Sequence, residues 1–123
     1  MIVAVAGGRD FNDPAFVSRI LWGFHSSNGI TEMHEGGAKG WDSWCRQWAR
    51  NQGIQVITYW ANWEKHGKAA GHMRNGLILE RAKPECLIAG PGGRGTANMV
   101  MQATKLGIRI YDAAKQLNYL KAN

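Results

Sequence analysis

The chain contains the stretch Glu85-Cys86-Leu87-Ile88-Ala89-Gly90-Pro91-Gly92-Gly93-Arg94-Gly95-Thr96, which decides its fold. Residues 85–90 are typical of a buried strand, and a helix is predicted from the loop to Leu106. A strand that ends in glycines and continues as a helix directs several backbone N–H groups at one point, where the helix dipole adds partial positive charge. The loop is therefore predicted to hold a phosphate or a carboxylate, with Arg94 and Thr96 as further donors. A tight turn that needs glycine for its backbone angles is the simpler alternative.

The rest of the chain repeats this order of strand, loop and helix. Strands are predicted over residues 2–6, 30–34, 55–59, 85–90 and 108–111, and helices over 14–28, 41–52, 69–82, 94–106 and 112–120. Alternating strands and helices with short connections imply a parallel sheet that helices cover on both faces. We therefore predict an α/β fold: a single Rossmann-like doubly wound domain over residues 1–123, with a mainly parallel five-stranded sheet.

Three glycine loops each follow a predicted strand and carry a basic residue. In a parallel sheet they lie at one edge, and the loops after strands one and four flank the switch point where ligands bind in this fold class. A composite site for an anionic ligand is predicted there. Its predicted ligand-binding residues from the three loops are Gly7, Gly8, Arg9, Asp10, Gly36, Gly37, Lys39, Pro91, Gly92, Gly93, Arg94, Gly95 and Thr96. None of the loops is a Walker loop or a complete GxGxxG fingerprint.

The segment from Trp60 to Asn75 is predicted to add side chains to this site. Arg74 can bind a phosphate through two parallel hydrogen bonds, and Asn75 can bind a sugar or the edge of a base. A surface ion pair within the helix is the alternative for Arg74. Trp60 and Trp63 lie in the loop on the ligand side and can stack on a base or take part in an interface.

Three carboxylates near the loops are candidates for proton transfer or for binding a ribose hydroxyl: Asp10, Glu35 and Asp42. Asp42 can equally be a first-turn helix residue that the dipole favours. With Arg74, Asp10 and Glu35 are the candidate catalytic residues. His66 and His72 have no cysteine nearby and do not match a metal site, so no metal or cofactor is predicted.

The composition is that of a folded protein, with 45% hydrophobic and 20% charged residues. No apolar run approaches the ~20 residues that span a bilayer, so no membrane contact is expected. The net charge of +6 favours anionic partners. Cys45 and Cys86 are predicted to be buried thiols in a reducing cytoplasm. A helical stripe of tryptophans, Trp41, Trp44 and Trp48, predicts core packing or a subunit interface.

Four motifs, taken in order, resemble those of the YspA/YpsA-related family of the SLOG superfamily. They are Gly7-Gly8-Arg9-Asp10-Phe11, Glu35-Gly36-Gly37-Ala38, Gly67-Lys68-Ala69-Ala70-Gly71 with Arg74-Asn75, and Pro91-Gly92-Gly93-Arg94-Gly95-Thr96-Ala97. The resemblance covers essentially the whole chain. It implies a Rossmann-like domain that binds a nucleotide or a nucleotide-derived ligand, in a family with many short bacterial and phage proteins.

One branch of that superfamily, the lonely-guy phosphoribohydrolases, carries the motif Pro-Gly-Gly-x-Gly-Thr-x-x-Glu, whose Glu acts in catalysis with an upstream Arg. The resemblance implies that Arg74 stands for that Arg. Met99 occupies the Glu position and cannot transfer a proton, and Asn98 beside it is not acidic. N-glycosidic hydrolysis would therefore need a carboxylate from Asp10, Glu35 or Asp42.

Three functions are consistent with this sequence. The first is binding of a nucleotide or another phosphorylated small molecule, for sensing or sequestering a signalling nucleotide. The second is hydrolysis of a nucleotide. The third is binding of single-stranded nucleic acid, which the positive charge favours. The resemblance implies it as well, because the SLOG superfamily includes DNA-processing protein A. We predict the first, in a homo-oligomer, because the tryptophan stripe and the habit of the superfamily favour assembly.

Overall fold

A parallel five-stranded sheet in the order β3-β2-β1-β4-β5 forms the centre of the computed structural model, which describes residues 1–116. The strands are β1 (Ile2–Ala6), β2 (Glu32–Glu35), β3 (Gln55–Thr58), β4 (Cys86–Ala89) and β5 (Arg109–Asp112). β1 pairs with β2 on one side and with β4 on the other, so the chain changes its direction of travel across the sheet at β1. The predicted parallel, doubly wound arrangement is confirmed.

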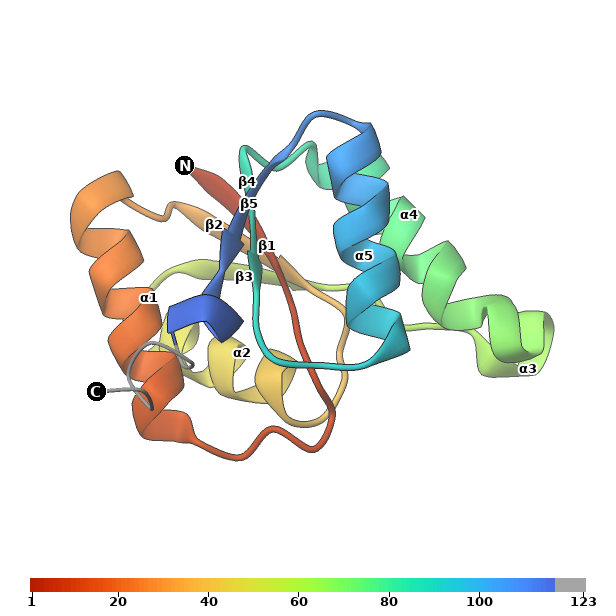
Figure 1. The fold of residues 1–123 in the computed structure, drawn as a ribbon, viewed down its shortest axis with the longest axis horizontal. Helices are drawn as coiled ribbons and strands as arrows, with labels where there is room; N and C mark the ends of the chain where they lie inside the picture. The colour runs from red at the N-terminus through yellow and green to blue at the C-terminus, as the bar shows by residue number, and fades with distance from the viewer. Residues whose placement is uncertain (117–123) are drawn as a thin grey trace.

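Helices cover both faces of this sheet, as predicted. They are α1 (Pro14–Asn28), α2 (Trp41–Asn51), α3 (Trp63–His66), α4 (Ala70–Ala82) and α5 (Arg94–Lys105), with a 3₁₀ turn η1 (Gly67–Ala69) before α4. α1 and α2 lie on one face, and α4 and α5 lie side by side on the other (Figure 1). Within residues 1–116, no helix has the length and apolar character that a membrane crossing needs.

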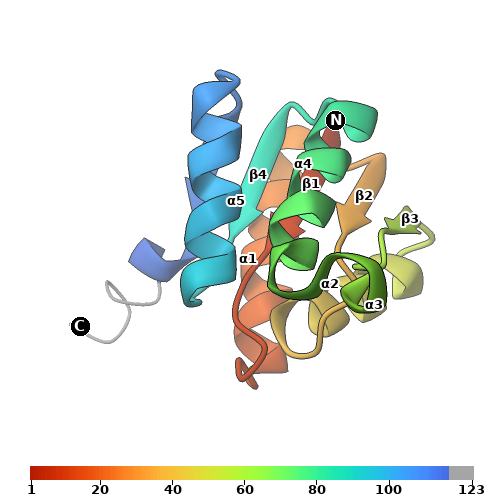
Figure 2. The same ribbon diagram turned by 90° about the vertical axis from the view of Figure 1, so that its right-hand side faces the viewer.

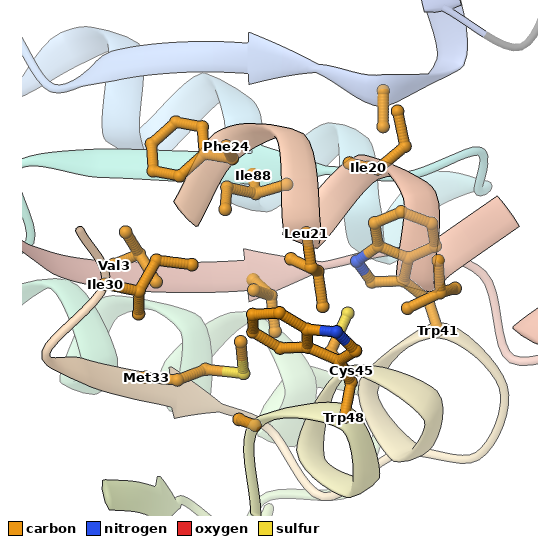
Figure 3. Close-up of a cluster of buried hydrophobic side chains, with 14 of the residues drawn as sticks. Val3, Ile20, Leu21, Phe24, Ile30, Met33, Trp41, Cys45, Trp48 and Ile88 are labelled. Atoms are coloured by element: carbon orange, nitrogen blue, oxygen red, sulfur yellow. The ribbon is translucent and has the colours of Figure 1, made fainter. Parts of the chain in front are cut away.

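Two hydrophobic cores fill the spaces between the sheet and its helices. The larger lies under α1 and α2 and includes Leu21, Phe24, Trp41 and Trp48 (Figure 3). Trp41 and Trp48 are buried and Trp44 packs half-buried against the same cluster, so core packing accounts for the tryptophan stripe. The stripe therefore gives no support to the expected homo-oligomer.

The second core lies under α4 and α5 and contains Ile78, Leu79, Leu87 and Met99. Met99 is 1% exposed, so the position that corresponds to the glutamate of the phosphoribohydrolase motif faces the sheet. The predicted thiols of Cys45 and Cys86 are both buried and free, as expected.

Local hydrogen bonds shift several of the predicted element boundaries. β2 begins at Glu32 instead of residue 30, because the N–H of Ile30 donates to His25 Nδ1 at 2.8 Å and the N–H of Thr31 donates to Met1 O at 2.9 Å. The other three strands after β1 differ from their predicted bounds by one or two residues.

The segment expected to be a polar loop before α4 contains a helical turn. The Asn62 side chain accepts a hydrogen bond from the N–H of Lys65 at 3.0 Å and so caps α3. Of the predicted closing helix over 112–120, residues 113–116 are helical, and the remainder lies outside the described residues.

Candidate functional site

A cavity of about 350 Å³ lies at the carboxyl edge of the sheet, beside the switch point between β1 and β4. Figure 2 shows that α3 and the N-terminal ends of α4 and α5 gather at this edge. Of the predicted ligand-binding residues, those that line the cavity are Gly7, Gly8, Arg9, Gly36, Asp42, Trp63, Arg74, Asn75, Gly93, Gly95 and Thr96. The fold thus brings together residues from all three glycine loops and from α4.

Backbone contacts between the three loops form the floor of the cavity. The N–H of Gly8 donates to Pro91 O at 2.7 Å, and the N–H of Trp41 donates to Gly8 O at 3.1 Å. A Cβ atom on Gly7 or on Gly90 would overlap the buried Trp41 ring, so both positions require glycine for close packing. One peptide, Gly8, therefore ties the loop after β1 to both of the others.

The N-terminus of α5 forms one wall of the cavity. Gly93 is its N-cap and provides no side-chain hydrogen bond. The amides of Arg94, Gly95 and Thr96 are the first of the helix, and such amides have no partner within a helix. Because the helix dipole places partial positive charge at the same point, this wall suits a phosphate.

Arg74 of α4 forms a second wall. Its Nη1 donates to Gly36 O at 2.5 Å, and its Nε donates to Asn75 Oδ1 at 3.1 Å. It makes no ion pair with a described residue, which contradicts the alternative of a surface pair within the helix. Burial lowers the pKa of the guanidinium, opposed by the nearby Asp42 carboxylate. The guanidinium still carries its charge at neutral pH, because arginine is not deprotonated in proteins.

Asn75 joins α4 to α5 next to this guanidinium. Its amide group donates to Gly95 O and to Asn98 Oδ1, each at 3.3 Å. Asn75 is 5% exposed, and its oxygen already accepts from Arg74. These hydrogen bonds of Asn75 hold the Arg74 guanidinium and the N-terminus of α5 at a fixed separation.

Asp42 lies in the first turn of α2 and faces the cavity from the β2 side. Its Oδ2 accepts hydrogen bonds from the N–H of Gly36 at 3.2 Å and of Ala38 at 3.4 Å. Its Oδ1 is buried and has no hydrogen-bond partner among the described residues. Burial raises the pKa of Asp42 to about 7, and the negative charge of Glu35 adds to the increase. The carboxyl can therefore exchange a proton near neutral pH.

Glu35 is occupied by groups of the protein itself. Its carboxylate accepts from the N–H of Gly37 at 2.7 Å and from Arg46 Nη1 at 2.9 Å, and the hydroxyl of Thr58 donates to its second oxygen. It is fully buried and does not line the cavity. In this structure Glu35 holds the loop after β2 in place.

An aromatic and several basic side chains form the outer rim. The Arg9 guanidinium lies over the Trp63 ring, 5.4 Å from its centroid. Trp63 is 48% exposed and lines the cavity, whereas Trp60, at 73% exposure, lies outside it. Lys68 also lines the cavity.

Six of the predicted ligand-binding residues do not line this cavity: Asp10, Gly37, Lys39, Pro91, Gly92 and Arg94. Lys39 and Arg94 are exposed. Asp10, Pro91 and Gly92 line a second, neighbouring depression, which shares Gly8 with the cavity. Gly37 has a positive φ of 71°. Asp10 is therefore placed apart from Arg74, with which it was grouped as a candidate catalytic residue.

Three further cavity residues were not predicted from the sequence: Lys68 in η1, and Gly71 and His72 in the first turn of α4. With Asn75 they recur at intervals of three and four residues, which is the spacing of one helix face. That periodicity could have identified them. Within residues 1–116, no group of three or more His, Cys, Asp or Glu residues is placed to hold a metal ion.

The sheet order and the position of the cavity define an α/β protein of the Rossmann type with its crevice at the switch point. The chain belongs to the YAcAr family, described as the YspA, cpYpsA-related SLOG family, whose sequence profile matches residues 1–66. It is also similar to the Gene 61 protein of Mycobacterium phage D29, with 35% identity over 117 residues that cover 88% of this chain and 92% of that protein. This likeness extends beyond residue 66, and the predicted family is confirmed.

Proposed function

We propose that the protein binds a nucleotide or a nucleotide-derived phosphorylated ligand in the switch-point cavity. The observation that carries this proposal is the N-terminus of α5, which faces the same cavity as the Arg74 guanidinium. Free helix amides and a guanidinium are the two groups that proteins use most directly for phosphate. A phosphate placed between them would complete the hydrogen bonds of both.

The charge of the cavity supports an anionic ligand. Arg9, Lys68 and Arg74 line it, and among the described residues Asp42 is its one carboxylate. The three positive charges attract phosphate. Asp42 marks the one position in the described lining where a hydrogen-bond donor of the ligand is favoured. The cavity volume of about 350 Å³ suits a small molecule, since ligand pockets cover roughly 300–1,000 Å³.

Trp63 gives the proposal its preference for a nucleotide over inorganic phosphate. Its indole lines the cavity, is half-exposed and packs against Gly71 at the start of α4. Aromatic side chains in such positions stack on bases of any identity. A phosphate at α5 and a base on Trp63 would account for both ends of the cavity.

Isothermal titration calorimetry with the 5′-monophosphates of adenosine, guanosine, cytidine and uridine, with ATP and with a single-stranded oligonucleotide tests this proposal. Arg74→Ala should weaken binding of the preferred nucleotide by roughly 10- to 100-fold, because a hydrogen bond to a charged group contributes about 1.5–3 kcal/mol. Arg81→Ala removes an exposed arginine from the other end of α4 and is the matched control. Unchanged affinity in Arg74→Ala, or binding of the oligonucleotide alone with a steep salt dependence, would overturn the proposal.

Hydrolysis of the bound nucleotide is a second candidate function, and the observation that favours it is Asp42. Its pKa of about 7 and its place in the lining of the cavity are properties of a general acid or base. Met99 is buried in the core and Asn98 Oδ1 accepts from Asn75 and Gln102, so neither supplies this chemistry from α5.

Chromatography of each nucleotide after incubation with the protein tests hydrolysis. Release of free base or ribose 5-phosphate by the wild type, lost in Asp42→Asn, would support an enzyme. Recovery of every nucleotide intact would leave binding as the function.

A further inference from the structure

The Oδ1 atom of Asp42 is a buried acceptor for which residues 1–116 provide no donor. Asp42 is 5% exposed, and its other oxygen accepts from two loop amides, those of Gly36 and Ala38. Buried polar atoms in folded proteins are nearly always hydrogen-bonded, because an unpaired one costs about 1–3 kcal/mol. Because Asp42 also lines the cavity, an unpaired acceptor on this side chain points to a donor that a ligand supplies.

The arginines near Asp42 donate to other groups in this structure. Arg74 uses Nη1 on Gly36 O and Nε on Asn75, and Arg46 donates to Glu35. The Gly36 peptide is held from both sides, since its N–H donates to Asp42 and its C=O accepts from Arg74. The remaining N–H groups of Arg74 stay available for a phosphate, and none of them donates to Asp42 Oδ1.

We propose that Asp42 accepts a hydrogen bond from a ribose hydroxyl of the ligand and so makes the protein selective for ribonucleotides over deoxyribonucleotides. This inference rests on the proposed function and adds the sugar to it. An ionised carboxyl accepts hydrogen bonds and repels phosphate, so the group opposite Asp42 is a donor. Hydroxyl groups of the sugar are the donors nearest to the phosphate in a nucleotide.

The shared cavity favours the sugar over an amino group of the base. Asp42 follows β2 and the phosphate wall follows β4, these strands lie on either side of β1, and both groups line the same cavity. In a nucleotide the sugar is bonded directly to the phosphate, whereas the amino groups of the base lie on the far side of the sugar.

The charges around Asp42 agree with this assignment. Burial is the largest cause that raises its pKa to about 7, with a further increase from Glu35, while Arg74 and the two loop amides lower it. Cys45, on the next turn of α2, is buried and its pKa is raised, so it stays neutral. At pH 8 the Asp42 carboxyl is therefore mostly ionised and able to accept from a hydroxyl.

Calorimetry at pH 8 with AMP, 2′-deoxy-AMP and 3′-deoxy-AMP, and with the same three forms of GMP, CMP and UMP, tests the inference. The wild type should bind the ribonucleotide at least 10-fold more tightly than one of its two deoxy analogues. Asp42→Ala should bind all three forms with affinities within about threefold of one another. Asp42→Asn, which keeps an oxygen for the loop amides, should show the same loss of selectivity if the alanine variant fails to fold. Glu80→Gln, on an exposed position of α4, should keep the wild-type ratio.

The outcomes separate this inference from the proposed function. If the wild type binds none of these nucleotides, the proposed function fails and the inference fails with it. If the wild type binds them with less than twofold selectivity, or if both Asp42 variants retain the selectivity, nucleotide binding stands and the role of Asp42 is refuted.

Discussion

Replacing Asp42 with asparagine is expected to stabilise the folded protein at pH 8. Burial is the largest cause that raises the pKa of Asp42 from its ordinary value of 3.8 to about 7, and the charge of Glu35 adds to it. Each pKa unit corresponds to about 1.4 kcal/mol, so ionised Asp42 destabilises the native state by up to about 4 kcal/mol. Asparagine cannot ionise and therefore removes this penalty.

The sign of the effect follows from where the proton is held. Between pH 3.8 and pH 7 the unfolded chain has released the Asp42 proton, whereas the folded chain retains it. The free energy of unfolding of the wild type therefore falls as the pH rises through this window. Asparagine still offers an oxygen to the N–H groups of Gly36 and Ala38, but a neutral acceptor forms weaker hydrogen bonds. We expect a net gain of about 1–3 kcal/mol at pH 8 and little or none at pH 4.

Urea unfolding at pH 4, 5, 6, 7 and 8, followed by tryptophan fluorescence, measures this difference. Glu80→Gln makes the same chemical change at an exposed position and should stay within about 0.5 kcal/mol of the wild type. An Asp42→Asn variant that is less stable than the wild type at pH 8, or whose difference from it does not grow with pH, would refute the reasoning. A confirmed gain would mean that Asp42 lowers stability, as functional residues often do.

Gly90→Ala is expected to lower the free energy of unfolding by about 1–3 kcal/mol, because the added methyl group overlaps the buried Trp41 ring. Gly23→Ala adds the same group in the middle of α1, where no atom of residues 1–116 lies within 4 Å, and should raise the free energy of unfolding by about 0.5–1 kcal/mol. Equal urea midpoints for the pair would contradict this packing. Trp63→Ala is expected to weaken AMP binding by roughly 5- to 100-fold while ribose 5-phosphate binding is unchanged, because stacking contributes about 1–3 kcal/mol per base. Calorimetry with both ligands checks this, and equal losses for the two would argue against stacking.

The fold could be predicted from the sequence because its signals are local. Phe16, Val17, Ile20, Leu21 and Phe24 recur at helical spacing, and all five are buried in α1. Each predicted strand of the sheet is present with small shifts at its ends. The shift of β2 comes from hydrogen bonds to His25 and Met1, which no local pattern contains.

The candidate site was only partly predictable, because a loop's composition does not say which way its side chains point. Arg74 and Asp42 line the cavity as expected, but Lys39 and Arg94 are exposed and outside it. Lys68 lines the cavity although it was not among the predicted ligand-binding residues. Arg9, Lys39, Arg74 and Arg94 were all candidates for phosphate in the sequence. The folded chain separates Arg9 and Arg74, which line the cavity, from the other two.

The alternation of strands and helices, the glycine loops at one edge of the sheet and the family could all be predicted before folding was considered, because periodicity and ordered motifs are properties of the linear chain. Only the folded chain shows that Asp42 lines the cavity with one oxygen unpaired among residues 1–116, while both oxygens of Glu35 accept hydrogen bonds. The two carboxylates are seven positions apart and of similar acidity as free side chains. Their difference arises from burial and from partners such as Arg74, which lies 38 residues from Gly36 and meets that loop only in the folded protein.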